Sequence, residues 1–262
     1  MKYIKKMLLV VIATLIIPSH MTAMGPTKRF SKKIVMPLLE QALFDALDVK
    51  RDIKPLLAHV NPNITSAPYN LTPIHVAALK AHDSAIRDLH KAGGLPNPVD
   101  IFGQGPAHLT AQFKPQETQE FLEGKAAHNI IDALHEIGVN INARDIKRRT
   151  PLMTAASEGN YPVVEALLKH KPDLDAQDDD GDTALHKAAR KPCISSLELL
   201  LKHGARQDLP NERFFLPREH NTHLPRLAAL FDKYKTGTPQ ATSDQPKLDE
   251  STESHLTFLT KE

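Results

Sequence analysis

The feature that most constrains the fold is a short pattern that recurs at a fixed distance along the chain. Residues 72–78 read TPIHVAA, residues 105–111 read GPAHLTA, residues 150–156 read TPLMTAA and residues 183–189 read TALHKAA. Thr72 to Gly105 and Thr150 to Thr183 are both steps of 33 residues. A unit of this size cannot bury its own apolar face, so we expect successive units to stack on one continuous core.

Residues 179–208 show how one unit is expected to fold. Gly181 supplies a turn, and Thr183 is a helix N-cap candidate because its hydroxyl can accept a bond from a free N–H of the first turn. A second, leucine-rich helix follows and ends near Gly204, which suits a left-handed backbone. These positions and their period resemble the ankyrin repeat. The resemblance implies an all-α solenoid of helix–turn–helix units with hairpin loops, capped at both ends.

The domain boundaries follow from the phase of the pattern. We expect a degenerate N-terminal cap at 36–69, repeats at about 70–99, 100–142, 144–176 and 177–208, a degenerate C-terminal cap at 209–235, and a disordered tail at 236–262. Three aromatic residues of the last cap, Phe214, Phe215 and Phe231, are expected to seal the array. A small apolar island, residues 255–259, lies within the polar tail and is either a docking peptide or a chance occurrence.

The second repeat is too long for the period. Gly105 to Thr150 is a step of 45 residues, and the excess falls at about 112–124. Insertions in repeat proteins map to loops, often on the binding side. The insertion is therefore a binding loop, a longer first helix or a neutral surface loop, and the sequence leaves these open.

The first residues have the order of a secretory signal peptide. Lys2, Lys5 and Lys6 precede an apolar run at residues 7–17, and Ala23 offers a small residue for cleavage. The run is short for a permanent membrane span, which needs about 20 residues. We expect a signal peptide at 1–23, a linker at 24–35 and export to the periplasm or the medium. The alternative is a membrane-anchored protein held by residues 7–17.

Composition argues against several classes of function. The net charge is only +2 and no lysine or arginine stripe dominates the repeats, so we expect no nucleic-acid partner. Cys193 is the only cysteine, so no intramolecular disulfide is possible. We expect it to be a packing residue, because nothing near it in the sequence would activate a thiol.

The 14 histidines invite a metal or catalytic interpretation, but the repeat accounts for most of them. His75, His108 and His186 occupy one repeat position, where the resemblance implies a structural bond between turns. Another set lies near the ends of second helices: His59, His90, His135, His170 and His203. Stacked helices are about 10 Å apart and zinc ligands lie about 2 Å from the ion, so we expect successive members of this column to be too distant to share a metal.

No catalytic constellation is found. The chain has no glycine-rich phosphate loop, nucleophile elbow or H-E-x-x-H helix. Residues 178–182 superficially resemble a calcium loop but lack the bidentate Glu at the required spacing. We expect no cofactor, no metal and no catalytic residues.

What remains is a surface. The resemblance implies that partners bind a concave groove formed by the hairpin tips and the exposed face of each first helix. The positions of this chain that match are Phe102, Gln104, Lys147, Arg148, Arg149, Asp179, Asp180, Asp182, Lys187 and Arg190. Apolar tip residues would suit a binding hot spot, but packing between neighbouring tips explains them equally well. The opposite charges of two successive tips would likewise suit mutual pairing on the surface.

These observations predict an exported, non-enzymatic, monomeric module that binds another protein. Two rivals remain from the sequence. One is a scaffold tethered to a membrane by residues 7–17, and the other is an enzyme whose site lies on the 112–124 insertion.

Overall fold

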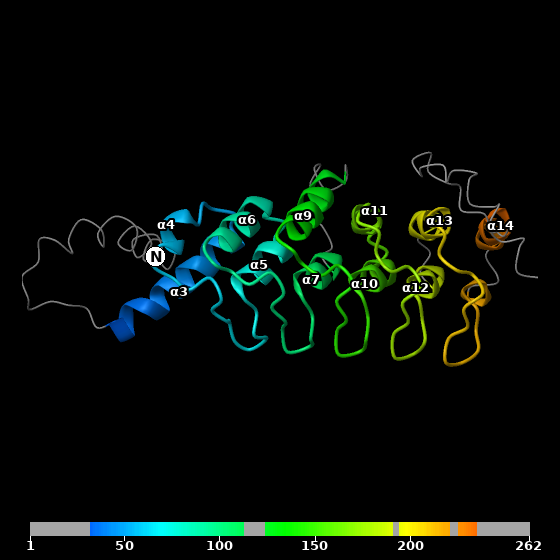
Figure 1. Ribbon diagram of the computed structural model, residues 1–262, viewed down its shortest axis with the longest axis horizontal. Helices are drawn as coiled ribbons and strands as arrows, with labels where there is room; N and C mark the ends of the chain where they lie inside the picture. Colours follow the sequence, from blue (N-terminus) through cyan, green and yellow to red (C-terminus); the bar gives the residue numbers. More distant parts are fainter. Residues whose placement is uncertain (1–31, 113–123, 191–193, 221–224, 235–262) are drawn as a thin grey trace, which may run out of the picture.

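The computed structural model describes residues 32–112, 124–190, 194–220 and 225–234, and it is a row of helix pairs in two layers (Figure 1). The first layer contains α5(Pro73–Leu79), α7(Pro106–Gln112), α10(Pro151–Glu158) and α12(Ala184–Arg190). The second contains α6(Asp83–Lys91), α9(Lys125–Glu136), α11(Tyr161–Leu168) and α13(Ile194–Lys202). The described residues form no strand, only an isolated bridge between Ser66 and Leu71. The predicted all-α solenoid is confirmed.

The repeating pattern marks the start of each first-layer helix. Thr72, Thr150 and Thr183 stand directly before α5, α10 and α12, so they occupy equivalent places in the stack. The Oγ1 atom of Thr150 accepts a hydrogen bond from the Met153 N–H at 3.3 Å. Proline follows two of these threonines at the first helical position, where its missing N–H costs nothing. Local sequence therefore fixes where each unit begins.

The two layers bury different kinds of side chain. Alanines of the first layer, such as Ala77, Ala111 and Ala155, are fully buried and let neighbouring first helices approach closely. The second layer buries Leu89, Ile131, Leu134, Leu167 and Leu200 completely. Each such side chain contributes about 2 kcal/mol by leaving water. Each helix packs on its counterpart in the next unit, so the core is continuous along the array.

Three buried histidines join each unit to the next. The Nδ1 atoms of His75, His108 and His186 accept from the backbone N–H three residues earlier, at 3.1–3.2 Å. Their Nε2 atoms bond to backbone oxygens of the following hairpin: Gln104 at 3.1 Å, Arg149 at 2.9 Å and Phe215 at 3.0 Å. Because Nδ1 accepts, the hydrogen sits on Nε2 and the rings are neutral. The structural role that the resemblance implied is confirmed.

One junction lacks this bond, because Met153 occupies the histidine position in the third unit. The matching acceptor is the backbone oxygen of Asp182, directly before Thr183. We expect Met153→His to raise the free energy of unfolding by about 1 kcal/mol, the typical net contribution of one hydrogen bond. Urea unfolding at neutral pH measures the change. Met153→Leu, which offers no donor, serves as the control, and equal stability of the two variants would contradict the prediction.

The ends of the array differ from the inner units. α3(Lys32–Asp48) and α4(Lys54–Leu57) form the first cap, and α3 begins at Lys32, before the expected start at 36. The second cap consists of a 3-10 turn, η2(Pro217–Glu219), and α14(Pro225–Lys233). Phe231 is buried as expected, but Phe214 is 86% exposed and Phe215 is 48% exposed. The prediction that both seal the array is wrong, since they lie on the last hairpin rather than over the core.

Several sequence predictions lie outside the described residues. They concern the signal peptide, most of the linker and of the 112–124 insertion, Cys193 and the tail. Among the helices that the structure does describe, none is both long enough and apolar enough to cross a membrane.

Candidate functional site

Of the hairpin loops that project below the first layer in Figure 1, those at residues 100–104, 145–149, 178–182 and 211–215 form the same kind of turn. In each, the side-chain oxygen of an Asp or Asn accepts from the backbone N–H two and four residues later, at 2.8–3.0 Å. The four acceptors are Asp100, Asp145, Asp178 and Asn211. All four are buried, so they shape the hairpins and are not available to a partner.

Backbone bonds also join each hairpin tip to the next. The N–H of Ile101 donates to the oxygen of Tyr69 at 3.2 Å, and that of Ile146 donates to Phe102 at 3.1 Å. The ladder continues from Asp179 to Lys147 at 3.1 Å and from Glu212 to Asp180 at 3.0 Å. The five tips are therefore held in register, and their side chains are placed before any partner arrives.

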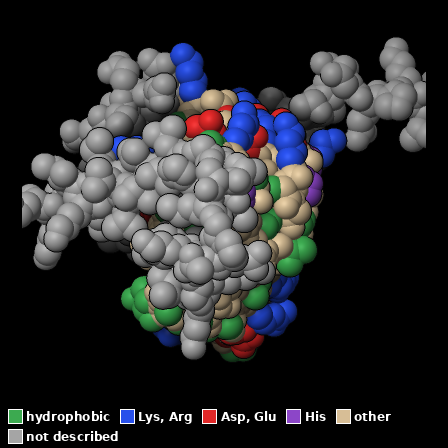
Figure 2. All heavy atoms as spheres, turned by 90° about the vertical axis from the view of Figure 1, so that its left-hand side faces the viewer, with side chains coloured by type: hydrophobic (Ala, Val, Ile, Leu, Met, Phe, Trp, Pro, Cys, Tyr) green, Lys and Arg blue, Asp and Glu red, His purple; other side chains and the backbone are tan. Residues whose placement is uncertain are grey.

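The first three of these tips carry exposed apolar side chains. Tyr69 is 51% exposed, Ile101 52%, Phe102 44% and Ile146 63%. The rings of Tyr69 and Phe102 lie 6.3 Å apart. In the end view of Figure 2, hydrophobic side chains appear at the lower edge beside basic and acidic ones, on the side where Figure 1 places the hairpins. Large side chains so exposed at adjacent positions are typical of an interaction surface.

Two exposed cations continue this surface. Lys147 and Arg148 follow Ile146 on the third tip, and neither forms an ion pair with any described carboxylate. We call the set Tyr69, Ile101, Phe102, Ile146, Lys147 and Arg148 the tip strip. Sequence reasoning did not single out Tyr69, although it precedes Phe102 by one period of 33 residues.

The structure separates the ten expected site residues into three groups. Phe102, Lys147, Arg148, Asp179 and Asp180 are exposed on tips, as expected. Arg149, Lys187 and Arg190 each bond to a buried aspartate. Gln104 is 5% exposed and Asp182 is fully buried, so the expectation of a surface position is wrong for these two. Both lie directly before a first-layer helix, and Asn211 of the next hairpin contacts the Asp182 carboxylate.

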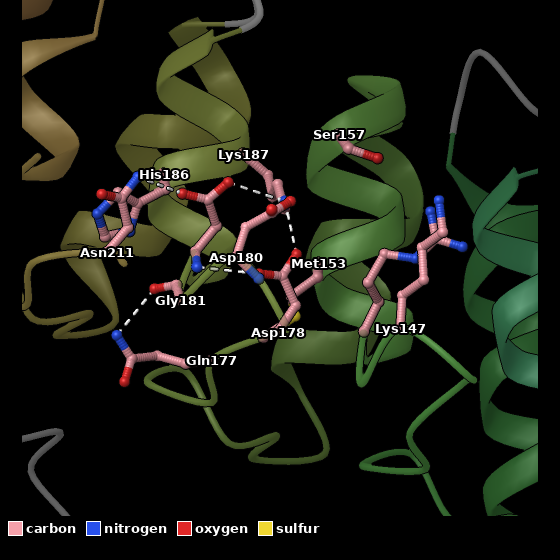
Figure 3. Close-up of polar contacts among 12 residues, drawn as sticks. Lys147, Met153, Ser157, Gln177, Asp178, Asp180, Gly181, His186, Lys187 and Asn211 are labelled. Carbon is pink, nitrogen blue, oxygen red and sulfur yellow. Dashed lines mark hydrogen bonds and ion pairs between the residues drawn. The ribbon is translucent and has the colours of Figure 1, made fainter. Parts of the chain in front are cut away.

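The buried Asp182 is the centre of an ionic cluster. Figure 3 labels three of its members, Asp178, Lys187 and Asn211. The Asp182 carboxylate accepts from Lys187 Nζ at 2.9 Å, Arg190 Nη2 at 3.1 Å and Asn211 Nδ2 at 2.8 Å. Lys187 also reaches Asp178 at 2.6 Å. Burial alone would raise the pKa of Asp182, but Asn211, Lys187 and Arg190 outweigh it, so the pKa is lowered. The cluster ties the fourth unit to the second cap.

Two groups of possible metal ligands occur among the described residues, and both include Asp182 of this cluster. They are Asp182 with His186 and His220, and Asp178 with Asp180 and Asp182. The oxygens of Asp182 already face two cations, and both nitrogens of His186 already bond to the backbone. A second cation would be repelled there by Lys187 and Arg190.

The histidine column on the second layer differs from expectation. The ring centroids of His135 and His170 are 4.3 Å apart, so the expected separation of about 10 Å, the spacing of stacked helices, is wrong for this pair. The rings lean toward each other from α9 and the end of α11, which the spacing of helix axes does not reveal. His170 Nε2 bonds to Asp132 Oδ1 at 2.7 Å.

The buried histidines predict that stability falls on mild acidification. Burial lowers the pKa of His75, His108 and His186 below the ordinary 6.5. The unfolded chain therefore binds protons first, and the free energy of unfolding should decline as pH falls below about 6.5. Urea unfolding between pH 7.5 and pH 5 measures this slope. His75→Gln should make the slope shallower, and Met153→His should make it steeper; a flat profile would contradict the assignment of neutral rings.

The chain is similar to known proteins over part of its length. A family model described as ankyrin repeats (3 copies) matches residues 121–211. The B-cell lymphoma 3 protein homolog of Mus musculus is 28% identical over 166 residues, covering 53% of this chain and 37% of that protein. Neurogenic locus notch homolog protein 1 of Homo sapiens is 29% identical over 142 residues, covering 54% of this chain and 5% of that protein. The chain thus spans well under half the length of these relatives.

Proposed function

Because the chain is an ankyrin-repeat protein, we propose that it is an exported, non-enzymatic module that holds another protein on its hairpin tips and first helices. Ankyrin repeats are protein–protein interaction modules. The observation that carries the proposal for this chain is the tip strip, in which exposed apolar side chains adjoin two cations that pair with no described carboxylate, on a hydrogen-bonded ladder.

The tip strip has the composition of a binding hot spot. Aromatic and arginine side chains dominate such sites, and truncating one of them typically costs 2 kcal/mol or more. Tyr69 and Phe102 would provide the aromatic anchors, and Arg148 would provide the guanidinium. A monomer of this rigid form would lose little conformational entropy on binding, because the ladder already orders the backbone of the tips.

Export rests on the sequence of residues 1–23 and is part of the same proposal. The order of basic, apolar and small residues supports cleavage after Ala23. N-terminal sequencing of the mature protein tests it. A mature chain that starts at Met24 supports release, whereas an intact Met1 supports the membrane-tethered alternative.

The role of the tip strip is tested by comparing the proteins that the wild type, a tip-strip variant and a control variant capture. In one variant, Phe102, Ile146, Lys147 and Arg148 are all replaced by Ala. The matched control replaces Val49, Leu95, Lys169 and Lys171 by Ala; these are also two exposed apolar and two exposed basic residues, and they lie away from the tips. We expect the first variant to lose a protein that the wild type and the control both recover. Equal recovery by all three chains would contradict the proposal.

A further inference from the structure

The tip strip has a chemically matching segment within the same chain. Residues 249–259 read DESTESHLTFL, in which Asp249, Glu250 and Glu253 precede Leu256, Phe258 and Leu259. The strip offers the complementary set, with Lys147 and Arg148 on one tip and exposed apolar side chains on that tip and the two before it. Both acidic and apolar parts therefore have a counterpart.

The order of the two parts also agrees. The tip nearest the second cap carries the exposed Phe214 and Phe215, and the next carries the exposed Asp179 and Asp180. Within the tip strip itself, the order toward the N-terminal end is Lys147 and Arg148, then Ile146, and then Phe102 and Tyr69. A segment that leaves α14 and runs back along the tips meets the cations with its carboxylates and the apolar tips with its phenylalanine and leucines. The opposite order in either partner would set carboxylates against Phe102.

The length of chain is sufficient. Phe258 lies 24 residues beyond Tyr234, the last described residue, and 24 residues can span up to about 80 Å when extended. Stacked helices are about 10 Å apart, so the three to four units between the second cap and the apolar tips extend over about 30–40 Å.

We propose that residues 249–259 dock on the tip strip of their own chain and thereby compete with a partner protein. This inference rests on the proposed function only in naming the strip as the partner surface. Docking would leave the strip covered until a partner of greater affinity displaces the segment. It also gives a counterpart to Lys147 and Arg148, which form no ion pair with a described carboxylate although Asp179 lies on the adjacent tip.

The chain has no tryptophan, so Phe258→Trp in the full chain gives a single fluorescent reporter. We expect its emission to be shifted to the blue and shielded from acrylamide. Adding Lys147→Glu and Arg148→Glu should abolish both effects. The matched control is Lys169→Glu with Lys171→Glu, because each pair lies in the third unit and contains one residue of positive φ, Arg148 at 57° and Lys171 at 51°.

A charge exchange makes the test specific. Asp249→Lys with Glu250→Lys should restore shielding to the chain that carries Lys147→Glu and Arg148→Glu. If Phe258→Trp is fully accessible to acrylamide in the otherwise unaltered chain, the proposal is overturned. It is also overturned if Lys147→Glu with Arg148→Glu and Lys169→Glu with Lys171→Glu have the same effect on the shielding of the reporter. Shielding that disappears on dilution would also overturn it, since it would show that a second copy is the occupant. This test uses the chain alone, without a partner protein. A failure of the segment to dock would therefore not count against the proposed partner surface, which the capture experiment tests separately.

Discussion

Asp182→Ala should lower the free energy of unfolding by about 3 kcal/mol or more. The substitution leaves Lys187, whose side chain is 11% exposed, and Asn211 without their shared carboxylate. Breaking a buried ion pair from one side typically costs about 3–5 kcal/mol, because the remaining charge stays buried. Asp178 still faces Lys187, which places the expected value at the lower end of that range.

Urea unfolding at pH 7 measures this effect, with Asp232→Ala as the control. Asp232 pairs with Arg218 at 3.2 Å, but its side chain is 59% exposed, so its loss should cost less than about 1 kcal/mol. Similar losses from the two substitutions would show that the cluster around Asp182 does not hold the fourth unit to the cap. Because the pKa of Asp182 is lowered, its contribution should persist at neutral pH and disappear only as pH falls below about 3.8.

Gly181→Ala should be about as damaging, for a steric reason. Gly181 has φ +73°, and a Cβ there would lie 2.5 Å from the backbone nitrogen of Glu212 and 3.0 Å from Asn211. The neighbouring hairpin would have to move, and that movement would strain the bond from Glu212 to Asp180. We expect a loss of about 3 kcal/mol, from a left-handed alanine plus the displaced backbone.

Gly138→Ala separates the cost of a left-handed alanine from the cost of the displaced backbone. Gly138 has φ +83°, but nothing lies within 4 Å of a Cβ built on it. Its replacement should cost only the conformational part, about 1–2 kcal/mol. Thermal or urea unfolding of both variants checks the difference. If Gly138→Ala were as destabilising as Gly181→Ala, the close approach of adjacent tips would not be the cause.

The parts of the fold that could be predicted from the sequence are those that each unit encodes locally. Thr72, Thr150 and Thr183 mark helix starts through their own hydroxyls or through the ring three residues on, so their spacing reveals the stack. The second cap keeps the same phase, since Leu216 stands directly before η2 and lies 33 residues after Thr183. The hydrogen bond between His186 Nε2 and the backbone oxygen of Phe215, which joins the fourth unit to this cap, follows from that phase.

The parts that sequence could not reveal depend on what the next unit covers. Acidic residues at a turn are normally solvated, so Asp182 was expected on the surface, yet the following hairpin places Asn211 against its carboxylate. Gln104 is buried as well. Tyr69 was missed because its hairpin follows a cap that lacks the repeated pattern, and only the 33-residue step to Phe102 points to it.

The error in the expected spacing of the histidine column is explained by the length of the side chains. His135 and His170 were placed at the spacing of helix axes, but long side chains on adjacent helices close most of that distance. Periodicity predicts which residues share a face. It does not predict how far two side chains lean toward each other across it.

The central claim is that the tip strip is the surface on which this protein holds its partner. The most direct measurement is the dissociation constant of the purified partner for Phe102→Ala, compared with Leu95→Ala, which removes an apolar side chain that is 60% exposed and lies outside the tips. Loss of a central aromatic anchor of about 2 kcal/mol corresponds to roughly 30-fold weaker binding by Phe102→Ala, with Leu95→Ala unchanged. Equal affinity of the two variants would contradict the account.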